Sequence, residues 1–461
     1  ADTITRLARE IATTKPCSVN QGWGIQRHSN GESQARAPML LANLIGQVGI
    51  PGGGTGEREG SASLGMAAFP ALENPVRPVI SFYQWTDAIL HGKGWTYKDG
   101  VRDARDLNSN ANVTNDVTLN SNIKFIWNYG SNSLINQHGD INKTIEILSD
   151  ESACEMIVVI DNQMTVSARY ADIVLPDATT AEQIDLAVEG SSGDMGYAIF
   201  ADKAIEPLYD CMPVYEQLTL LADKLGVKDE FTEGRSQEDW VRWLVDESRK
   251  TIPELPSFEE FREQGLFRKK LDPVVPFADF REDPEANALP TPSGKIEIWS
   301  ENIHKISQDW PVEEGNYIDP LPIYRQTREM PGDDLQGTYP LQCIGHHYKQ
   351  RTHSSYGNSP WLKEAHPQHV WLNTLDAEER GIAHGDPIRV FNDRGALELP
   401  AYVTERIMPG VISVPQGAWY RPESPGGVDK GGSTNVLTSH QTTAYAKANG
   451  QHSALVQVEK A

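Results

Sequence analysis

The sequence predicts an α/β protein in three parts: a doubly wound parallel sheet, a mixed α/β segment and a small β-barrel. In the first 200 residues, continuous apolar runs typical of buried parallel strands alternate with helical patterns. After about residue 338, short apolar segments alternate with Gly/Pro turns, as in small barrels. The 461 residues suggest about three domains at roughly 150 residues each. We therefore expect domains over residues 1–200, 201–335 and 336–461.

The first part reads as strand, polar loop, helix and strand, which is the pattern of a doubly wound sheet. Ile4, Leu7 and Ile11 recur at helical spacing, and an Ala/Leu-rich stretch ends at Gly46. The run from 156 to 160 is continuously apolar, as expected for a strand buried on both faces. We expect helices over 4–11, 35–45 and 142–148, and strands over 124–128, 156–160 and 171–175.

The second part is less regular. An amphipathic pattern over 214–225 stops at Gly226, and a second helix fits 240–245. Residues 250–292 are rich in Pro, Glu and Phe, so we expect them to be irregular. A turn at 291–294 leads into a predicted strand over 295–299. In the third part, we expect strands over 388–392, 397–403 and 411–415, separated by turns at 393–395 and 408–410.

Composition excludes several classes of protein. Forty-one Lys and Arg against 64 Asp and Glu give a net charge of −23, which disfavours nucleic acid or an anionic membrane as the main partner. Four scattered cysteines without a CxxC spacing argue against a zinc or iron–sulfur site on this chain, so we expect separate buried thiols. No apolar run reaches the roughly 18 residues of a membrane span. The sequence opens within a helical pattern without a leader, so we expect the later part of a longer polypeptide.

Two candidate sites follow predicted strands. Gly130, Ser131 and Asn132 come directly after the strand at 124–128, where small residues let backbone N–H groups approach a ligand. Asp161 ends the next strand and Thr165 follows it, so a carboxylate and a hydroxyl face the same edge. A ligand-free turn and a helix cap are the alternatives for these two segments.

A third candidate is the segment 22–27, where Gly24 permits close backbone approach, Gln26 offers an amide and Arg27 a cation. Arg27 can equally be a surface salt-bridge partner. A fourth candidate is the glycine-rich segment 431–437, either a mobile surface loop or a polar loop pressed against a ligand. A GxGxxG fingerprint and a P-loop are both missing from the sequence.

The fifth candidate is a histidine cluster, since six of the 12 histidines lie between residues 346 and 384. Their spacing fits neither HExxH nor a zinc finger, so polar contacts to a heterocycle and a diphosphate are favoured over metal binding. The residues that would make them are Gly345, His346, Arg351, His353 and Ser354. No Ser–His–Asp set, paired carboxylates or Cys–His pair stands out, so the chain shows no obvious nucleophile or general acid.

Taken in order, several segments resemble the molybdopterin oxidoreductases of the dimethyl sulfoxide reductase family, in the branch that reduces dimethyl sulfoxide or selenate. The segments are Gly22 to Arg27 with Asn30 and Gly31, Gly46 to Gly54, Trp127 to Asn132, Tyr170 to Pro176, Thr291 to Glu297 and Asp376 to Asp386. The resemblance runs nearly end to end. It implies a Rossmann-like first domain, a middle segment belonging to a discontinuous domain, and a six-stranded double-psi-type barrel that binds molybdopterin dinucleotide.

The resemblance also implies a bis(molybdopterin guanine dinucleotide) molybdenum cofactor. By position, Gly130, Ser131, Asn132, Asp161 and Thr165 would hold a guanosine end. Gly345, His346, Arg351, His353 and Ser354 would hold pterin and phosphate, with Asn435 and Gln451 closing the far side. The family's [4Fe–4S] region and its molybdenum-ligating serine would lie upstream of this chain.

Oxygen-atom transfer from an S-oxide or related oxyanion in anaerobic respiration is the function that the resemblance implies. The implied partners are an iron–sulfur electron-transfer subunit and a membrane-anchor subunit at the periplasmic face of the bacterial inner membrane. A non-catalytic structural subunit that keeps the fold without molybdenum is the alternative. A nicotinamide dehydrogenase is a third reading, disfavoured by the missing glycine fingerprint.

Overall fold

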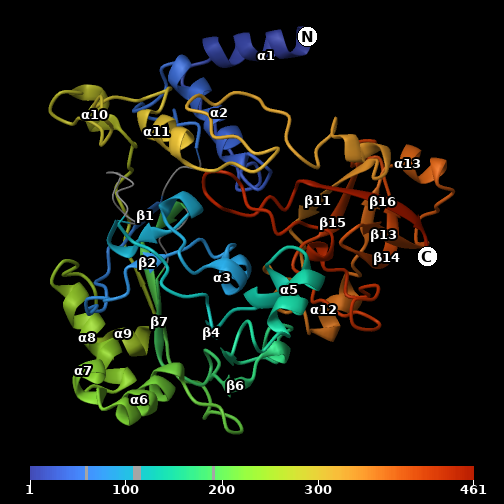
Figure 1. Cartoon of the computed structure of the whole chain (residues 1–461). Helices are drawn as coiled ribbons and strands as arrows, with labels where there is room; N and C mark the ends of the chain where they lie inside the picture. Colours follow the sequence, from blue (N-terminus) through green and yellow to red (C-terminus); the bar gives the residue numbers. More distant parts are fainter. Residues whose placement is uncertain (58–60, 107–115, 189–192) are drawn as a thin grey trace.

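The computed structural model describes residues 1–57, 61–106, 116–188 and 193–461, and its helices and strands are arranged as in Figure 1. At the N-terminus, α1 (Asp2–Thr13) and α2 (Gly31–Leu44) confirm the first two predicted helices. The apolar stripe of α1 is exposed, because Ile4 and Leu7 keep 73% and 53% of their surface. Helix α2 ends before Gly46, whose φ of +67° is the left-handed conformation that glycine adopts at little cost.

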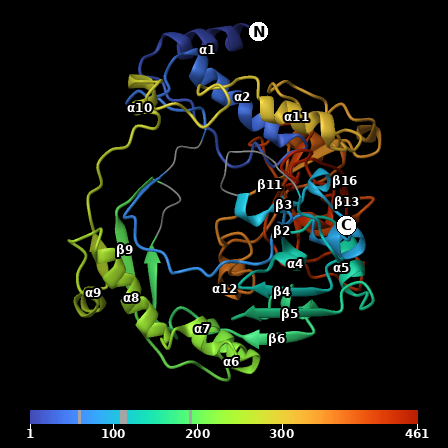
Figure 2. The same cartoon turned by 60° about the vertical axis from the view of Figure 1, so that its left-hand side comes forward.

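A three-stranded parallel sheet follows, and its order is β4–β5–β6. Figure 2 shows α4 and α5 between this sheet and the barrel. Side chains of one sheet face, such as Ile157 and Val159, form a core with residues of α3 and α5. On the opposite face Phe125, Trp127 and Tyr129 lie exposed. The elements are α3 (Trp85–His91), β4 (Phe125–Tyr129), α4 (Ser133–Asn136), α5 (Ile141–Leu148), β5 (Met156–Asp161) and β6 (Ile173–Pro176).

The middle of the chain builds an antiparallel sheet of order β10–β9–β7, packed against α8 and α9 around the buried Phe258 and Phe261. Helix α6 has the predicted bounds and ends at Gly226 in the left-handed conformation. The elements are β7 (Asp185–Val188), β9 (Tyr197–Ala201), α6 (Val214–Leu225), α7 (Lys228–Thr232), α8 (Gln237–Arg249), α9 (Phe258–Gln264), β10 (Leu266–Arg268), α10 (Ala278–Glu282) and α11 (Glu301–Asp309).

Two expectations for this region are wrong. Residues 250–292 are not wholly irregular, because Ser257 caps α9. The Ser257 hydroxyl accepts a hydrogen bond from the Glu260 N–H, and the Glu260 carboxylate accepts one from the Ser257 N–H. Residues 295–299 form no strand, since no described strand pairs with them; Ile296 and Ile298 are instead exposed. The turn before them is present, with the Gly294 N–H donating to the Thr291 carbonyl.

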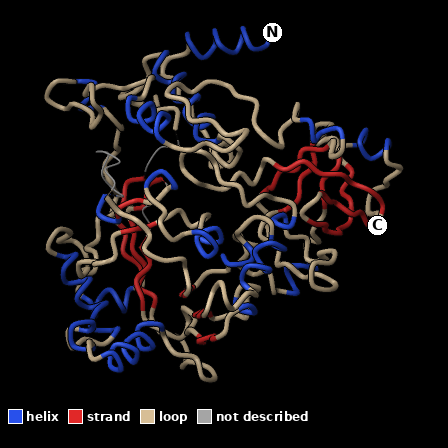
Figure 3. Tube along the Cα trace, in the orientation of Figure 1, coloured by secondary structure: helices blue, strands red, loops and turns tan. Residues whose placement is uncertain are grey.

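The C-terminal part is a closed barrel of order β11–β15–β12–β14–β13–β16. Two of its strand pairs, β11–β15 and β12–β14, are parallel and the others are antiparallel. Fully buried side chains including Val370, Leu397 and Ile412 fill its interior. Figure 3 shows the strands concentrated in this barrel and in the β7–β9 sheet. The elements are β11 (Leu341–His346), α12 (Pro360–Ala365), β12 (Val370–Leu372), α13 (Thr374–Glu379), β13 (Pro387–Asn392), β14 (Gly395–Val403), β15 (Val411–Pro415) and β16 (Ala454–Lys460).

This architecture confirms the predicted fold class, a mixed α/β protein with a six-stranded barrel. The double-psi crossing and the domain boundaries at 200 and 335 stay predictions. Short elements complete the described chain: β1 (Ser61–Ser63) pairs with β8 (Gly193–Met195), and β2 (Pro78–Val79) pairs with β3 (Arg102–Asp103). None of the described helices is long and apolar enough to cross a membrane. All four cysteines are free, but only Cys154 and Cys343 are buried, so the expectation of four buried thiols is wrong for Cys17 and Cys211.

Candidate functional site

A cavity of about 830 Å³ lies between the carboxyl edge of the β4–β5–β6 sheet and one end of the barrel. It forms where the rule for parallel sheets places ligands, outside the carboxyl ends of the strands. Most of the residues singled out from the sequence line it together. They are Arg27, Gly130, Ser131, Asn132, Asp161, Thr165, Gly345, His353, Ser354, Asn435 and Gln451.

The turn after β4 forms the sheet side of the cavity. Gly130 has a φ of +54°, and its N–H donates to the Ile160 carbonyl at 2.9 Å, which ties the turn to β5. The Asn128 amide nitrogen donates to the Ser131 carbonyl at 2.6 Å. The Asn132 side-chain oxygen accepts from both the N–H and the hydroxyl of Ser167, at 3.0 Å each. These bonds fix the amide of Asn132 with its nitrogen left over for a ligand.

Two carboxylates stand at the ends of β5 and β6. Asp161 accepts a hydrogen bond from the Gln163 N–H at 3.1 Å, and burial raises the pKa of its carboxyl. Burial likewise raises the pKa of Asp177, which also lines the cavity. The Thr165 hydroxyl accepts from the Ala168 N–H at 3.2 Å, at the start of a short 3-10 helix whose N-cap is Ser167, and Thr165 also lines the cavity.

The barrel side consists of loops that follow β11 and β15. Gly417 has a φ of +84°, and a Cβ at this position would lie 1.7 Å from the His353 carbonyl oxygen. Any other residue would therefore push apart two segments of the cavity wall. The Trp419 indole donates to the Ser354 carbonyl at 2.8 Å, and the Gly345 N–H donates to His452 Nδ1 at 3.2 Å. Burial lowers the pKa of His452 to about 4, so its imidazole is neutral near pH 7.

Four predicted residues do not reach the cavity wall. Arg351 donates to the carbonyls of Gln416 and Pro415 and stacks on Tyr348, and burial lowers its pKa to about 10. Arg351 therefore holds the backbone of Pro415 and Gln416 in place and does not itself line the cavity. The His346 ring lies 2.6 Å from the Ser413 hydroxyl, and burial lowers its pKa.

Gly24 and Gln26 form the turn that presents Arg27. The Arg27 N–H donates to the Gly24 carbonyl at 3.0 Å. A Cβ on Gly31 would lie 2.0 Å from the Gln26 carbonyl oxygen, which explains the glycine at the start of α2. The role of these two residues is thus to shape the turn beside the cavity.

The segment 431–437 is pressed against the rest of the site. The Asn435 amide nitrogen donates to the Asn136 carbonyl at 2.8 Å, which joins the barrel loop to α4. On the barrel, the Gln451 amide nitrogen donates to the Gln416 side-chain oxygen at 3.2 Å. The structure places Ser433, Thr434 and Asn435 of this segment in the cavity wall, and its contact with a ligand stays a prediction.

Several lining residues did not emerge from the sequence. Asn162, Gln163, Gln416 and Gly417 follow strand ends, so the strand-end rule could have found them. Tyr83 comes from a stretch without clear periodicity and reaches the cavity only through the tertiary fold. The other lining residues are Ser133, Asn136, Gln137, Asp177, Ser355, Tyr356, Asn358 and Trp419, whereas Ser433 and Thr434 belong to the predicted segment 431–437.

Buried polar atoms of the wall indicate what the cavity accepts. Asn132 Nδ2, Asn136 Oδ1, Gln416 Nε2 and Thr434 Oγ1 are buried without a hydrogen-bond partner. Buried polar groups are normally paired, so these donors and acceptors call for a polar ligand. Arg27 supplies a cation, and Asp161 and Asp177 supply acceptors. Within the described ranges, no three His, Cys, Asp or Glu side chains gather as a metal site. The wall is thus suited to bind a polar ligand that both donates and accepts hydrogen bonds.

Comparison with known proteins gives two family matches. The model described as "Molybdopterin oxidoreductase" matches residues 6–224, and the model described as "Molydopterin dinucleotide binding domain" matches residues 341–455. The chain is 53% identical to "Dimethyl sulfoxide reductase DmsA" of Escherichia coli (strain K12), covering 100% of this chain and 55% of that protein. It is 50% identical to the protein of the same name from Haemophilus influenzae, covering 100% and 56%. The chain thus spans about half the length of these relatives.

A solved structure shares the fold. Acetylene hydratase from Pelobacter acetylenicus matches with a TM-score of 0.57 and 21% identity, over 74% of this chain and 45% of that one. At this identity the likeness bears on the fold alone.

Proposed function

Because this chain belongs to the dimethyl sulfoxide reductase family of molybdopterin oxidoreductases, we propose that its cavity holds a guanosine end of a bis(molybdopterin guanine dinucleotide) molybdenum cofactor. The unpaired buried atoms of Asn132, Asn136, Gln416 and Thr434 carry this proposal. They line one cavity, and a polar heterocycle with a diphosphate would satisfy them. The proposed reaction is the reduction of an S-oxide or related oxyanion.

The sheet side is assigned to the base. When ionised, the Asp161 carboxylate can accept two N–H bonds from the edge of a guanine. The Asn132 amide nitrogen is held by Ser167 in a position to donate. Thr165 and the backbone of Gly130 and Ser131 complete this wall.

The barrel side is assigned to the diphosphate and pterin. Arg27 would neutralise phosphate, and the His353 imidazole and the amides around it would bind polar ring edges. The cofactor, when bound, supplies the two-electron oxygen-transfer chemistry. The chain's own residues hold it, orient it and exclude water around the pterin.

We extend the proposal to the whole protein on the strength of its relatives. The 53% identity to a protein named as a dimethyl sulfoxide reductase supports an S-oxide as substrate. The family resemblance supports a [4Fe–4S] cluster outside these residues, an iron–sulfur electron-transfer subunit and a membrane-anchor subunit. It likewise supports anaerobic respiration at the periplasmic face of the inner membrane.

The test is Asp161→Asn in the whole protein. The amide presents one donor where the guanine needs an acceptor, so we expect guanine-nucleotide affinity to fall about tenfold or more, on the order of 1.5–3 kcal/mol. Molybdenum and acid-released guanine nucleotide are quantified per protein, together with S-oxide-dependent oxidation of a reduced viologen dye.

Asp150→Asn is the matched control. Asp150 precedes β5, at the opposite end of the sheet, and accepts hydrogen bonds from Ser152 outside the cavity. Wild-type protein without molybdenum and guanine nucleotide would overturn the cofactor proposal and favour a non-catalytic structural subunit. Equal nucleotide content in Asp161→Asn and wild type would overturn the placement of the guanosine.

A further inference from the structure

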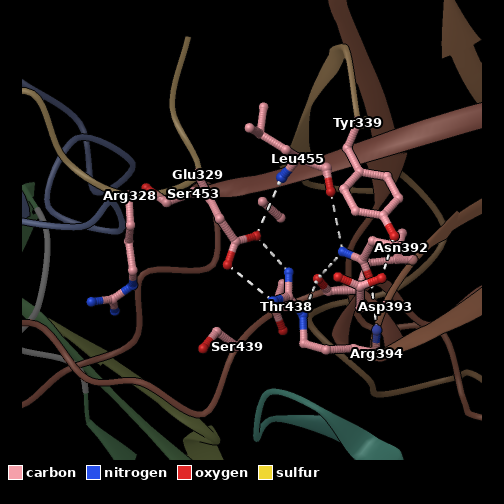
Figure 4. Close-up of polar contacts among 12 residues, drawn as sticks. Arg328, Glu329, Tyr339, Asn392, Asp393, Arg394, Thr438, Ser439, Ser453 and Leu455 are labelled. Carbon is pink, nitrogen blue, oxygen red and sulfur yellow. Dashed lines mark hydrogen bonds and ion pairs between the residues drawn. The ribbon is translucent and has the colours of Figure 1, made fainter. Parts of the chain in front are cut away.

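An ion pair outside the cavity connects three segments of the chain (Figure 4). Glu329 lies in the segment before the barrel, and Arg394 lies in the turn between β13 and β14. The Arg394 Nη1 and Nη2 atoms donate to the two Glu329 carboxylate oxygens at 2.9 and 2.5 Å. The Leu455 N–H of β16 points at the same carboxylate at 3.4 Å. This bidentate arrangement fixes both side chains in position.

Glu329 is buried and Arg394 is partly buried, and the backbone of Glu329 is constrained. The Glu329 side chain is 8% exposed and that of Arg394 is 21% exposed. Glu329 also has a φ of +50°, in the left-handed region that a glutamate rarely adopts. Such a conformation persists only where the surroundings hold it, and here the Asp333 carboxylate accepts from the Glu329 N–H at 2.7 Å.

The same turn holds the segment 434–440, which we call the cavity loop. Arg394 Nε and the Asn392 amide nitrogen both donate to the Leu437 carbonyl, each at 2.9 Å. Arg328, next to Glu329, donates to the Gln441 carbonyl just beyond the loop, also at 2.9 Å. These three side chains therefore hold the cavity loop in place by hydrogen bonds to the carbonyls of Leu437 and Gln441.

On its other side, the cavity loop forms the wall and contacts the sheet half of the molecule. Thr434 and Asn435 line the cavity. The Thr438 carbonyl accepts from the Asp140 N–H at 2.8 Å, just before α5. Asn142 of α5 donates to the Arg394 carbonyl at 2.9 Å, so the turn contacts both halves directly.

We propose that Glu329 and Arg394 are a positioning pair that sets the place of the cavity loop and thereby the affinity for the guanosine-bearing cofactor. The identity of the ligand rests on the proposed function. The claim that the pair holds the cavity loop in place does not depend on that ligand. With Glu329 neutral, the partly buried Arg394 loses its ion-pair partner and turns its guanidinium toward water. The Leu437 carbonyl then loses one of its two donors, and the loop loosens at Asn435.

The experiment uses Glu329→Gln and Arg394→Lys in the holoenzyme. The glutamine keeps the size of Glu329 without its charge, and the lysine keeps the charge of Arg394 without its fork of donors. Amide hydrogen exchange is measured over 434–440 and over the barrel strands, and acid-released guanine nucleotide is quantified per protein. We expect exchange in the loop to rise about tenfold and nucleotide content to fall about threefold or more, with barrel-strand exchange unchanged.

Arg389→Gln is the matched control. Arg389 lies on β13, the strand that leads into the same turn, and the substitution breaks its ion pair with Glu459 of β16. That pair makes no contact with Leu437, so the loop and the nucleotide content should stay as in wild type. Loop exchange and nucleotide content that match wild type in both variants would overturn the proposal. A rise in exchange spread equally over the barrel strands would also overturn it, since the pair would then be a general stabiliser. If wild-type protein lacks guanine nucleotide and the two variants still show the local rise in exchange, the proposed function is overturned and the loop-holding role stays supported.

Discussion

The barrel and the β4–β5–β6 sheet meet the same cavity, yet they differ in how completely they bury their own surfaces. Each barrel strand pairs on both sides, and the side chains that face inward pack with one another. The sheet has three strands, and one of its faces is only partly covered: Val158 and Ile160 of the central strand β5 are buried there, but Phe125, Trp127 and Tyr129 of the edge strand β4 are exposed. Parallel sheets are normally covered on both. The barrel therefore provides a rigid wall by its own packing, whereas the sheet depends on contacts with its neighbours.

The largest expected effect is in the barrel core. Leu397 is fully buried among strands from across the barrel, so Leu397→Ala removes packing that the closed structure cannot replace by collapsing. We expect the free energy of unfolding to fall by about 3 kcal/mol, measured by urea denaturation. Val159→Ala on the covered sheet face should cost about 2 kcal/mol, because fewer atoms are lost. A loss below about 1 kcal/mol for Leu397→Ala would contradict the view of the barrel as the rigid wall.

The boundary between the two regions should be the part that acid weakens first. His138 is buried there, with its Nε2 atom 2.9 Å from the Thr86 hydroxyl and its ring 4.7 Å from that of His440. Burial lowers the pKa of His138 to about 3, against about 6.5 in an unfolded chain. The unfolded state then binds the extra proton, so stability is complete above pH 6.5 and falls as the pH drops toward 3.

We expect this residue to contribute a loss of about 2 kcal/mol between pH 6.5 and 4.5, measured by urea denaturation across that range. The groups that face this pair are Asp87 and Asp140 beside His440 and the ring of Tyr83. His138→Gln keeps a hydrogen-bonding side chain but does not titrate, so its stability should depend less steeply on pH. An equally steep dependence in His138→Gln would assign the acid sensitivity to other groups, such as His452.

The same contrast explains what could be predicted from the sequence. Strand β15 matches its expected bounds of 411–415, because apolar alternation and flanking turns are local signals. The pattern at 295–299 looked similar, but a strand forms only when another strand pairs with it, and none of the described strands lies beside these residues. Helix α9 was missed although Ser257 and Glu260 carry a capping-box spacing, which is a signal that the sequence does contain.

For the site, the strand-end rule placed Gly130 and Asp161 correctly at one cavity, because topology alone decides where parallel strands end. Arg351 was assigned to the ligand from its charge, but the fold directs its guanidinium to the carbonyls of Pro415 and Gln416. The contact of Asn358 with Gln163 across the cavity, at 2.6 Å, joins residues almost 200 positions apart. Such pairs depend on how the barrel sits against the sheet, which a local pattern does not encode.

The smallest expected effect is on the partly covered face of the sheet. Trp127 keeps 40% of its surface exposed between Phe125 and Tyr129, so Trp127→Tyr, which keeps most of the aromatic area and adds a hydroxyl, should change the free energy of unfolding by less than about 1 kcal/mol. Exposed apolar patches promote association, so the same substitution should lower self-association of the chain, measured by sedimentation velocity. Val159→Ala, on the opposite face of the same sheet, should show the reverse pattern of lower stability and unchanged association. If Trp127→Tyr costs as much as Val159→Ala, the face that carries Trp127 is packed in solution, and the sheet is as complete a wall as the barrel.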